Sequence, residues 1–275
     1  MPMIEIHDHN DPRLDDFREI KERDLHGRQG VFIGEQPLIV EQMLERPELI
    51  RRVLVIKSKQ KWLEETLQKY GGPNIECLII QKDMLEKIAG FDVHRGVLAS
   101  GNRESIDRKS LEDVVPQSST PATILCCESI NNLDNVGMLF RTAAAFAVDG
   151  VLLSPECHDP LYRKSLRVSI GHALSIPFYR STDWESDLKK LRSSYGFTLV
   201  GAAIGERSVP HLLAPISSPS RIALIMGNEF DGLRPESISQ CEHVLRIPMA
   251  KNVDSLNVCV AAAVLLDQLS QGHRI

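Results

Sequence analysis

Apolar and polar positions alternate through the first hundred residues with two different periodicities. Short apolar runs between polar residues predict strands, whereas apolar residues three and four apart predict helices. An amphipathic helix is expected over 14–27, closed by Gly27, and then a strand and a helix within 30–48. This order predicts a small α/β unit over residues 1–100. The other expected elements of this unit are strands at 51–58, 75–81 and 94–100 and helices at 61–71 and 82–90.

A polar stretch at 101–123 interrupts the alternation, with two prolines and no sustained periodicity. It is the best candidate for a linker, which we place at 101–121. The alternation then resumes, so 122–275 is expected to form a second α/β domain. Its short, strongly apolar runs are typical of a parallel sheet buried on both faces. The expected strands are 124–128, 151–154, 197–204, 221–227 and 243–249, and the expected helices are 135–150, 183–196 and 255–272.

The composition excludes several classes of protein. With 275 residues, 43% hydrophobic and 25% charged, the chain can bury one large core or two modest ones. No apolar stretch is long enough to suggest a membrane span, and the N-terminus lacks the pattern of a secretory signal. The net charge of −5 argues mildly against a surface devoted to nucleic acid, but it leaves room for a local basic groove.

The residues that could bind metal do not form a convincing site. The six cysteines lie mostly in apolar runs without a C-x-x-C pair, which favours buried free thiols in a reducing compartment over zinc or disulfides. The cluster from His7 to His9 stands in a polar tail, expected to be mobile, without distant ligands. We therefore expect no metal and a cytoplasmic protein.

Polar residues directly follow three of the expected strands, where ligands bind in open parallel sheets. After the strand at 124–128, Asn135 can cap the next helix and Gly137 permits close backbone approach. Arg141 lies inside that helix. Taken on its own, it is more readily explained as a surface residue that pairs with a carboxylate.

The second strand end carries Glu229 in a loop bracketed by Gly227 and Gly232. This loop could be a ligand site or a plain turn. It is not a P-loop, because Leu and Arg rather than Lys and Ser or Thr follow its second glycine. The chain also lacks G-x-G-x-x-G after a strand, so a nucleotide-cofactor oxidoreductase loses its main support.

The third strand end precedes the apolar closing helix. Asp254 or Ser255 is expected to cap that helix, which leaves Asn257 unexplained as a poor helix former in the first turn. A helix that is apolar all round must be covered on all sides. A second subunit could supply half of that cover.

Together these three ends resemble a known family. The patterns N-x-G-x-x-x-R-T-A at 135–143, G-N-E-x-x-G-L at 227–233 and I-P-M…S-L-N-V-x-V-A at 247–261 resemble the three motifs of the SpoU (TrmH-like) branch of the SPOUT RNA methyltransferases. The segment 159–178 is similar to the family's stretch between its first and second motifs. The match covers about 122–270, and residues 1–100 resemble the ribosomal L30e-like substrate-binding domain.

The resemblance implies a fold and an activity. Members of the family transfer a methyl group from S-adenosyl-L-methionine to a ribose 2′-hydroxyl of tRNA or rRNA, bind the cofactor in a deep trefoil knot, and act as homodimers. Topology rules alone would have argued against a knot. The implied catalytic residues are Asn135, Arg141, Glu229, Ser255 and Asn257, and the implied cofactor-binding residues are Gly227, Ile247, Met249 and Leu256.

Two departures from the family pattern bear on loop shape and target choice. The stretch 131–135 lacks the usual Asp-Pro pair, and Phe230 and Asp231 replace small residues. Because an arginine side chain is normally never deprotonated, we expect Arg141 to act as an electrostatic clamp rather than as a base.

The expected RNA contacts are Arg51, Arg52, Lys164 and Arg167, although a solvated helix face would explain these residues equally well. The competing hypotheses are a non-catalytic RNA-binding protein that retains the fold and a SPOUT enzyme that methylates a base.

Overall fold

The chain, seen in a computed structural model, divides into two units. The structure describes residues 3–20, 30–70, 74–108, 110–117, 121–205, 208–211, 221–253 and 255–269. Unit 1 comprises Met1–Asp107 and Pro160–Leu174, and unit 2 comprises Arg108–Asp159 and Ser175–Ile275. The first crossing between units lies in the polar stretch at 101–123. The return of 160–174 to unit 1 was not expected, and the RNA-binding role of the N-terminal domain stays a prediction.

Unit 1 is built on a five-stranded mixed sheet with the order β1-β4-β3-β5-β2. β5 runs antiparallel to both of its neighbours, whereas the pairs β1–β4 and β3–β4 are parallel. The strands are β1 (Met3–Glu5), β2 (Val31–Glu35), β3 (Ile50–Ile56), β4 (Glu76–Ile80) and β5 (Val97–Asn102). The α-helices are α2 (Pro37–Leu44), α3 (Gln60–Lys69), α4 (Lys82–Ala89) and α6 (Arg163–Val168). The 3₁₀-helices are η1 (Pro12–Phe17), η2 (Pro47–Leu49), η3 (Lys57–Lys59), η4 (Arg103–Ser105) and η6 (His172–Leu174).

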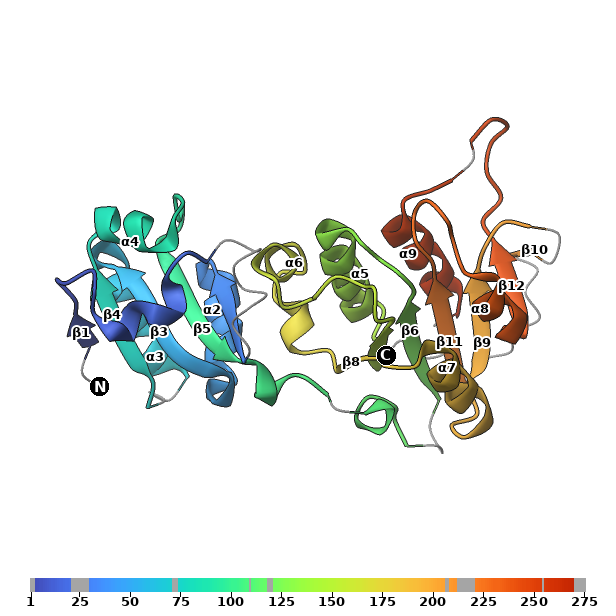
Figure 1. Cartoon of the computed structure of the whole chain (residues 1–275), viewed down its shortest axis with the longest axis horizontal. Coiled ribbons are helices and arrows are strands. Elements are labelled where there is room, and N and C mark those ends of the chain that lie inside the picture. The colour runs from blue at the N-terminus through green and yellow to red at the C-terminus, as the bar shows by residue number, and fades with distance from the viewer. Residues whose placement is uncertain are drawn as a thin grey trace. The chain divides into compact units, whose positions relative to one another are not determined.

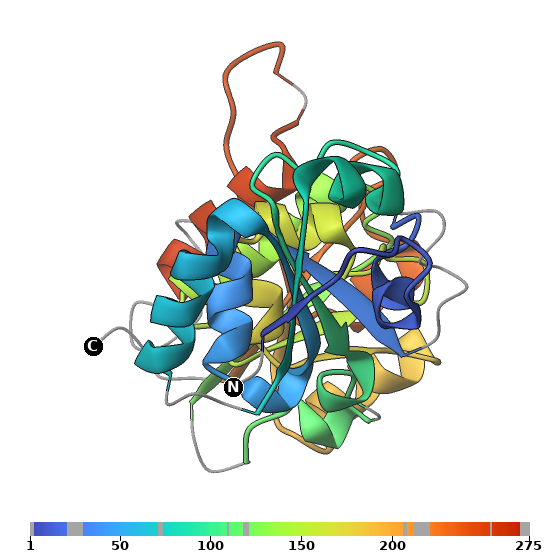
Figure 2. The same ribbon diagram turned by 90° about the vertical axis from the view of Figure 1, so that its left-hand side faces the viewer.

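Both faces of this sheet are covered. The helices α2 and α3 pack on one face, and η1 and α4 cover the other (Figures 1 and 2). The second face buries Leu14 and Phe17 of η1 and Leu85 of α4 against the apolar side chains of β2–β5. A buried aliphatic side chain stabilises a fold by ~1.5–3 kcal/mol, so these contacts account for the choice of face.

Unit 2 is built on a seven-stranded sheet with the order β10-β12-β9-β11-β6-β7-β8, in which every pair is parallel. The carboxyl ends of all its strands therefore lie along one edge. The strands are β6 (Ala122–Cys127), β7 (Gly150–Leu153), β8 (Phe178–Arg180), β9 (Thr198–Ala202), β10 (Val209–Pro210), β11 (Arg221–Met226) and β12 (His243–Arg246). The helices are η5 (Leu111–Asp113), α5 (Leu133–Ala145), α7 (Trp184–Ser193), α8 (Pro235–Gln240) and α9 (Val258–Leu269).

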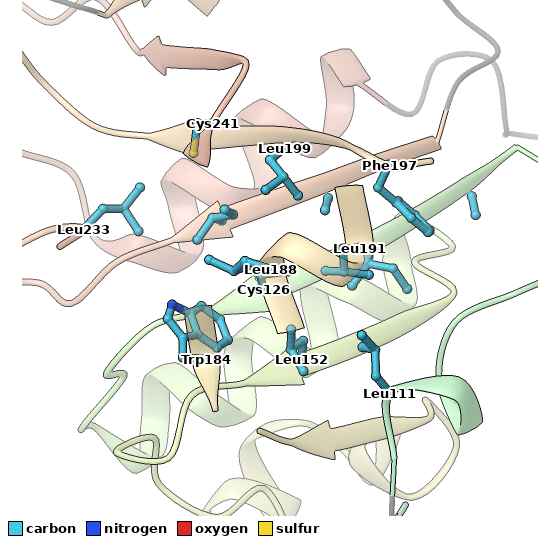
Figure 3. Packing of buried hydrophobic residues seen from close by; sticks show 14 of the residues in the cluster. Leu111, Cys126, Leu152, Trp184, Leu188, Leu191, Phe197, Leu199, Leu233 and Cys241 are labelled. Atoms are coloured by element: carbon cyan, nitrogen blue, oxygen red, sulfur yellow. The ribbon is translucent and has the colours of Figure 1, made fainter. Parts of the chain in front are cut away.

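The core of unit 2 forms because its central strands bury both faces. The helices α7 and α8 pack on one face, while α5 and α9 contact each other and α9 lies against β11. Figure 3 shows Trp184, Leu188 and Leu191 of α7 packed toward Cys126 of β6 and Leu199 of β9. The strand order agrees with the expected α/β class of the SPOUT fold. The trefoil knot stays a prediction.

Several expected elements are placed differently. Instead of a helix at 14–27, η1 ends at Phe17; residues 21–29 lie outside the described ones. The expected mobile tail contains strand β1, which pairs with β4. The helix expected at 135–150 spans Leu133–Ala145, and Gly150 begins β7. The sequence analysis missed α6, α8, β8 and β10. Among the described residues no helix is long and apolar enough to cross a membrane.

Candidate active site

The first motif begins α5, and its N-cap is not the asparagine that we expected. The side chain of Asn132 accepts hydrogen bonds from the backbone N–H groups of Asp134 at 2.8 Å and Asn135 at 3.2 Å. Asn132 therefore caps the helix, and the prediction for Asn135 is wrong. Because the helix starts two residues before Asn135, the amide of Asn135 is available for contacts with other segments.

The helix α9, which begins within the third motif, is also capped by an unexpected residue. Asn257 Oδ1 accepts from the N–H of Cys259 at 2.9 Å, and the Asn257 carbonyl accepts from Ala261 at 3.0 Å. Asn257 is thus the N-cap of α9 rather than a residue of its first turn. Ser255 precedes the cap and is exposed, while Asp254 lies outside the described residues. This accounts for a poor helix former directly before an apolar helix.

Three distant segments meet at Asn135. Asn135 Nδ2 donates to Glu229 Oε1, and Asn257 Nδ2 donates to Asn135 Oδ1 at 3.0 Å. Because the oxygen of the Asn257 amide accepts from the helix, its nitrogen must be the donor to Asn135, which fixes the orientation of both amides. Partners 94 and 122 positions apart are therefore held in one directed chain of hydrogen bonds.

A cysteine that the sequence analysis did not single out supports this chain. Cys259 Sγ donates to the backbone oxygen of Asn135 at 3.4 Å and lies 3.7 Å from its Oδ1. Burial, together with the nearby Glu229 carboxylate, raises the pKa of the Cys259 thiol to about 12. The thiol stays protonated near neutral pH and can act as a donor.

The loop that carries Glu229 is tightly held. A Cβ on Gly227 would clash with the backbone of Gly232 and Leu233, so only glycine fits there. Asn228 Oδ1 accepts from the Phe230 N–H at 2.7 Å, and Asn228 Nδ2 donates to the Ser129 carbonyl at 3.1 Å. The loop is thereby attached to the segment that follows β6.

A buried carboxylate braces the base of this loop. Glu128, which is 0% exposed, accepts from Ser237 Oγ at 2.7 Å and from the Arg234 N–H at 3.1 Å. Trp184 Nε1 donates to the same Ser237 hydroxyl at 3.1 Å. Arg234 also forms an ion pair with Glu156 at 2.9 Å, and this contact raises the pKa of Arg234. In the sequence, the signal for this network was an acidic residue, Glu128, at the end of an apolar strand.

A cleft of about 420 Å³ opens beside the loop. Its volume falls within the range of ~300–1,000 Å³ typical of small-molecule sites. Its walls combine apolar side chains with polar and charged ones, and the guanidinium of its Arg246 donates to Ser208. All four residues predicted to bind the cofactor line it, together with Glu229 and Ser255. The four are Gly227, Ile247, Met249 and Leu256.

Arg141 is not part of this hydrogen-bonded group. It lies on α5 six residues after Asn135, or about 240° around the helix, and it is exposed. Among the described residues no hydrogen bond or ion pair involves its side chain, so the structure shows no carboxylate partner of the kind that a surface residue would have. The structure thus brings together the other predicted catalytic residues on the cleft side and leaves the guanidinium available.

The predicted RNA-binding residues lie in unit 1, mostly beside carboxylates. Arg51 is exposed and lies 3.9 Å from Asp16, while Arg52 pairs with Glu76 and, at 3.4 Å, with Asp16. Arg167 of α6 lies 3.6 Å from Glu35, and its neighbour Lys164 is half-buried. Ion pairs reduce the positive potential that these residues could offer to RNA. Among the described residues no cluster of His, Cys, Asp and Glu could hold a metal ion.

Comparison with known proteins places these features in a family. The model of the SpoU rRNA methylase family matches residues 122–267. An uncharacterized tRNA/rRNA methyltransferase of Mycobacterium tuberculosis is 34% identical over 98% of this chain and 93% of that protein. A 23S rRNA (guanosine-2′-O-)-methyltransferase of Acinetobacter baylyi is 28% identical over 82% of this chain and 92% of its own length. An AdoMet-bound rRNA methyltransferase from Sinorhizobium meliloti has the same fold, with a TM-score of 0.79, 22% identity and 99% coverage of both chains.

Proposed function

The chain belongs to the SpoU rRNA methylase family and is an S-adenosyl-L-methionine-dependent RNA ribose 2′-O-methyltransferase, and we propose that it performs this reaction where α5, the loop after β11 and the start of α9 converge. One observation supports this location above all others. Asn135 is bonded both to Glu229 and to Asn257, so all three motifs meet beside one cleft.

The cleft fits the proposed cofactor in size and chemistry. The apolar side chains in its walls suit an adenine ring, and Gly227 lets a ligand approach the backbone of the loop closely. Glu229 and Asp231 supply negative charge at the rim, which is compatible with a sulfonium ion. When bound, S-adenosyl-L-methionine supplies a methyl group that is already activated for displacement. Gly227, Ile247, Met249 and Leu256 would hold it.

We propose that the polar cluster orients rather than reacts. The directed hydrogen bonds of Asn135 and Asn257 fix the loop that carries Glu229, and Ser255 stands beside the cleft where it can meet the ribose. Alignment of two reactants in this way can lower a barrier by ~7–11 kcal/mol. The protein's main task is therefore positioning.

Arg141 is proposed as the electrostatic clamp. A ribose hydroxyl is a very weak acid, and the developing negative charge needs a cation or donors nearby. The exposed guanidinium can bind a phosphate by two parallel hydrogen bonds. Since arginine is not deprotonated, the proton passes to a phosphate oxygen or to water.

A homodimer accounts for the position of Arg141. Met138 of α5 and Val260 of α9 are 38% and 50% exposed, although both are large apolar residues on contacting helices. Arg141 shares the exposed side of α5 with Met138. A dimer formed through these helices would cover the apolar residues and place Arg141 near the partner subunit. Light scattering tests this arrangement, and a monomeric mass would contradict it.

The substrate is proposed to be tRNA or rRNA in the cytoplasm, with unit 1 as the RNA-binding unit. Arg51, Arg52, Lys164 and Arg167 would contact phosphates after exchanging their carboxylate partners. The trefoil knot would form the cofactor site.

The decisive experiment follows the methyl group. The purified protein is incubated with tritium-labelled S-adenosyl-L-methionine and total RNA, and the RNA is then digested to nucleosides. Label on 2′-O-methyl nucleosides is the expected result, and the position is then mapped. Label on a base would identify a base methyltransferase. No label, together with no cofactor binding in calorimetry, would identify a non-catalytic RNA-binding protein.

A further inference from the structure

Phe230, at the rim of the cleft, is an aromatic side chain with nothing to cover it. It is 94% exposed, more than Ile204 at 65% and Leu256 at 41%, which also line the cleft. A bound cofactor can cover the residues in the walls of the cleft, but the ring of Phe230 is much more exposed than those residues. A phenylalanine left in water forgoes the stabilisation of apolar burial, so a partner that covers the ring would gain it.

The loop that carries the Phe230 ring is held by hydrogen bonds. Asn228 accepts a hydrogen bond from the Phe230 N–H at 2.7 Å, and the Gly232 N–H donates to the Asn228 carbonyl at 3.0 Å. Gly227 packs against the backbone of Gly232, which closes the turn from its other end. The backbone of Phe230 is thus fixed next to Glu229, the residue that holds Asn135. A loop whose backbone is already ordered loses little further entropy when it binds a flat ligand.

The charge around the ring indicates what that ligand is. The loop from Gly227 to Leu233 contains two carboxylates, Glu229 and Asp231, and neither lysine nor arginine. Such a loop repels phosphates but tolerates the neutral face of a nucleobase. Bases splayed out of RNA are commonly held by stacking on aromatic side chains.

We propose that Phe230 is the stacking platform for the nucleobase of the nucleotide being methylated. The proposal rests on the proposed function and names the part of the RNA that this loop recognises. Stacking would hold the base beside the loop and thereby present its ribose to the cluster around Asn135. Because every base has a π-face, the platform positions the nucleotide and does not by itself select one base.

The test uses Phe230→Leu, which keeps an apolar side chain without a ring, and Phe230→Trp, which keeps the ring. Loss of stacking is expected to raise the KM for RNA roughly 5- to 150-fold in the leucine variant, while the tryptophan variant stays near the wild type. Cofactor affinity, measured by calorimetry, is expected to remain unchanged in both. Val209→Ala, another exposed apolar position of unit 2 outside the cleft, serves as the control.

A second arm isolates the base itself. A transcript containing the mapped nucleotide is compared with one that is abasic at that position. The penalty of Phe230→Leu is expected to disappear on the abasic transcript, because neither enzyme can then stack. An equal penalty on both transcripts would overturn the proposal. So would a weakened cofactor affinity or a changed oligomeric mass, which would assign the ring to the cofactor or to a subunit interface.

Failure of the proposed function gives a different result. A wild-type protein that transfers no methyl group to ribose would refute that function before any variant is compared. Normal ribose methylation with no effect of the leucine variant on KM would refute only the stacking role.

Discussion

The two sheets of this protein are made of similar apolar strands but differ in direction. In unit 2 every strand runs the same way, so the loops after β6, β11 and β12 all lie at one edge. The three motifs lie in these loops or in the helices that follow them. In unit 1 the antiparallel β5 divides the strand ends between both edges. A uniformly parallel sheet gathers distant loops into one place, which is why we place the proposed active site in unit 2.

The polar clusters of the two units differ in the same way. The cluster of unit 2 consists of Asn135, Glu229 and Asn257 and lies beside the cleft. The side chain of Arg141 has no partner among the described residues. In unit 1 Glu35 pairs with Arg163 at 3.3 Å and Arg167 at 3.6 Å, and Arg163 lies over the ring of Phe91. The first arrangement keeps charge available for a substrate, and the second neutralises it.

The largest expected effect concerns Arg141. Replacement by alanine removes the proposed clamp and should lower turnover by ~10²–10³-fold, as loss of a charge-stabilising donor does. Arg141→Lys keeps the charge without the fork and should still lose ~10-fold or more. Turnover is measured by methyl transfer to RNA at saturating cofactor. Near-normal turnover of the lysine variant would rule out a fork-shaped role.

The next effect separates capping from orientation at Asn257. Asn257→Ala loses both roles, whereas Asn257→Ser can still cap α9 but cannot donate to Asn135. We expect both variants to lose ~10-fold in turnover, while only the alanine variant loses ~1 kcal/mol of stability. Methyl transfer and urea unfolding measure the two. Full activity in the serine variant would show that Asn257 only caps.

The brace of unit 2 should matter for stability. Glu128→Gln places an NH₂ group against one of two donors, the Arg234 N–H or the Ser237 hydroxyl. A buried donor without an acceptor costs ~1–3 kcal/mol. We expect urea unfolding to report a loss near the upper end, together with weaker cofactor binding. Unchanged stability would mean that the structure of the loop does not depend on the Glu128 carboxylate.

Of the two carboxylate replacements, the one in unit 1 has the smaller expected effect. Glu35→Gln leaves Arg163 with its contact to the Phe91 ring and with partial exposure, so a loss of ~1–2 kcal/mol is expected. Cofactor affinity should not change, in contrast to Glu128→Gln, because the cleft is lined entirely by unit 2. Calorimetry with S-adenosyl-L-methionine checks this, and an equal loss of affinity in both variants would remove the contrast between the units.

The sequence by itself determined the α/β class, most central strands and the three motifs. Runs such as 124–127 and 221–226 are apolar at nearly every position, a pattern typical of a strand buried on both faces. Four residues that line the cleft, Gly227, Ile247, Met249 and Leu256, were predicted from the resemblance of the motifs to a known family. This information lies in the local spacing of apolar and polar residues, which depends only on neighbouring positions in the chain.

Tertiary structure alone decided which partners meet. Asn132 rather than Asn135 caps α5, and Asn257 rather than Ser255 caps α9, because a helix start depends on packing that shifts it by two or three residues. Two features leave no trace in the sequence: the hydrogen bonds between Asn135 and residues 94 and 122 positions away, and the return of 160–174 to unit 1. Such contacts arise only when the folded chain brings distant segments within hydrogen-bonding distance.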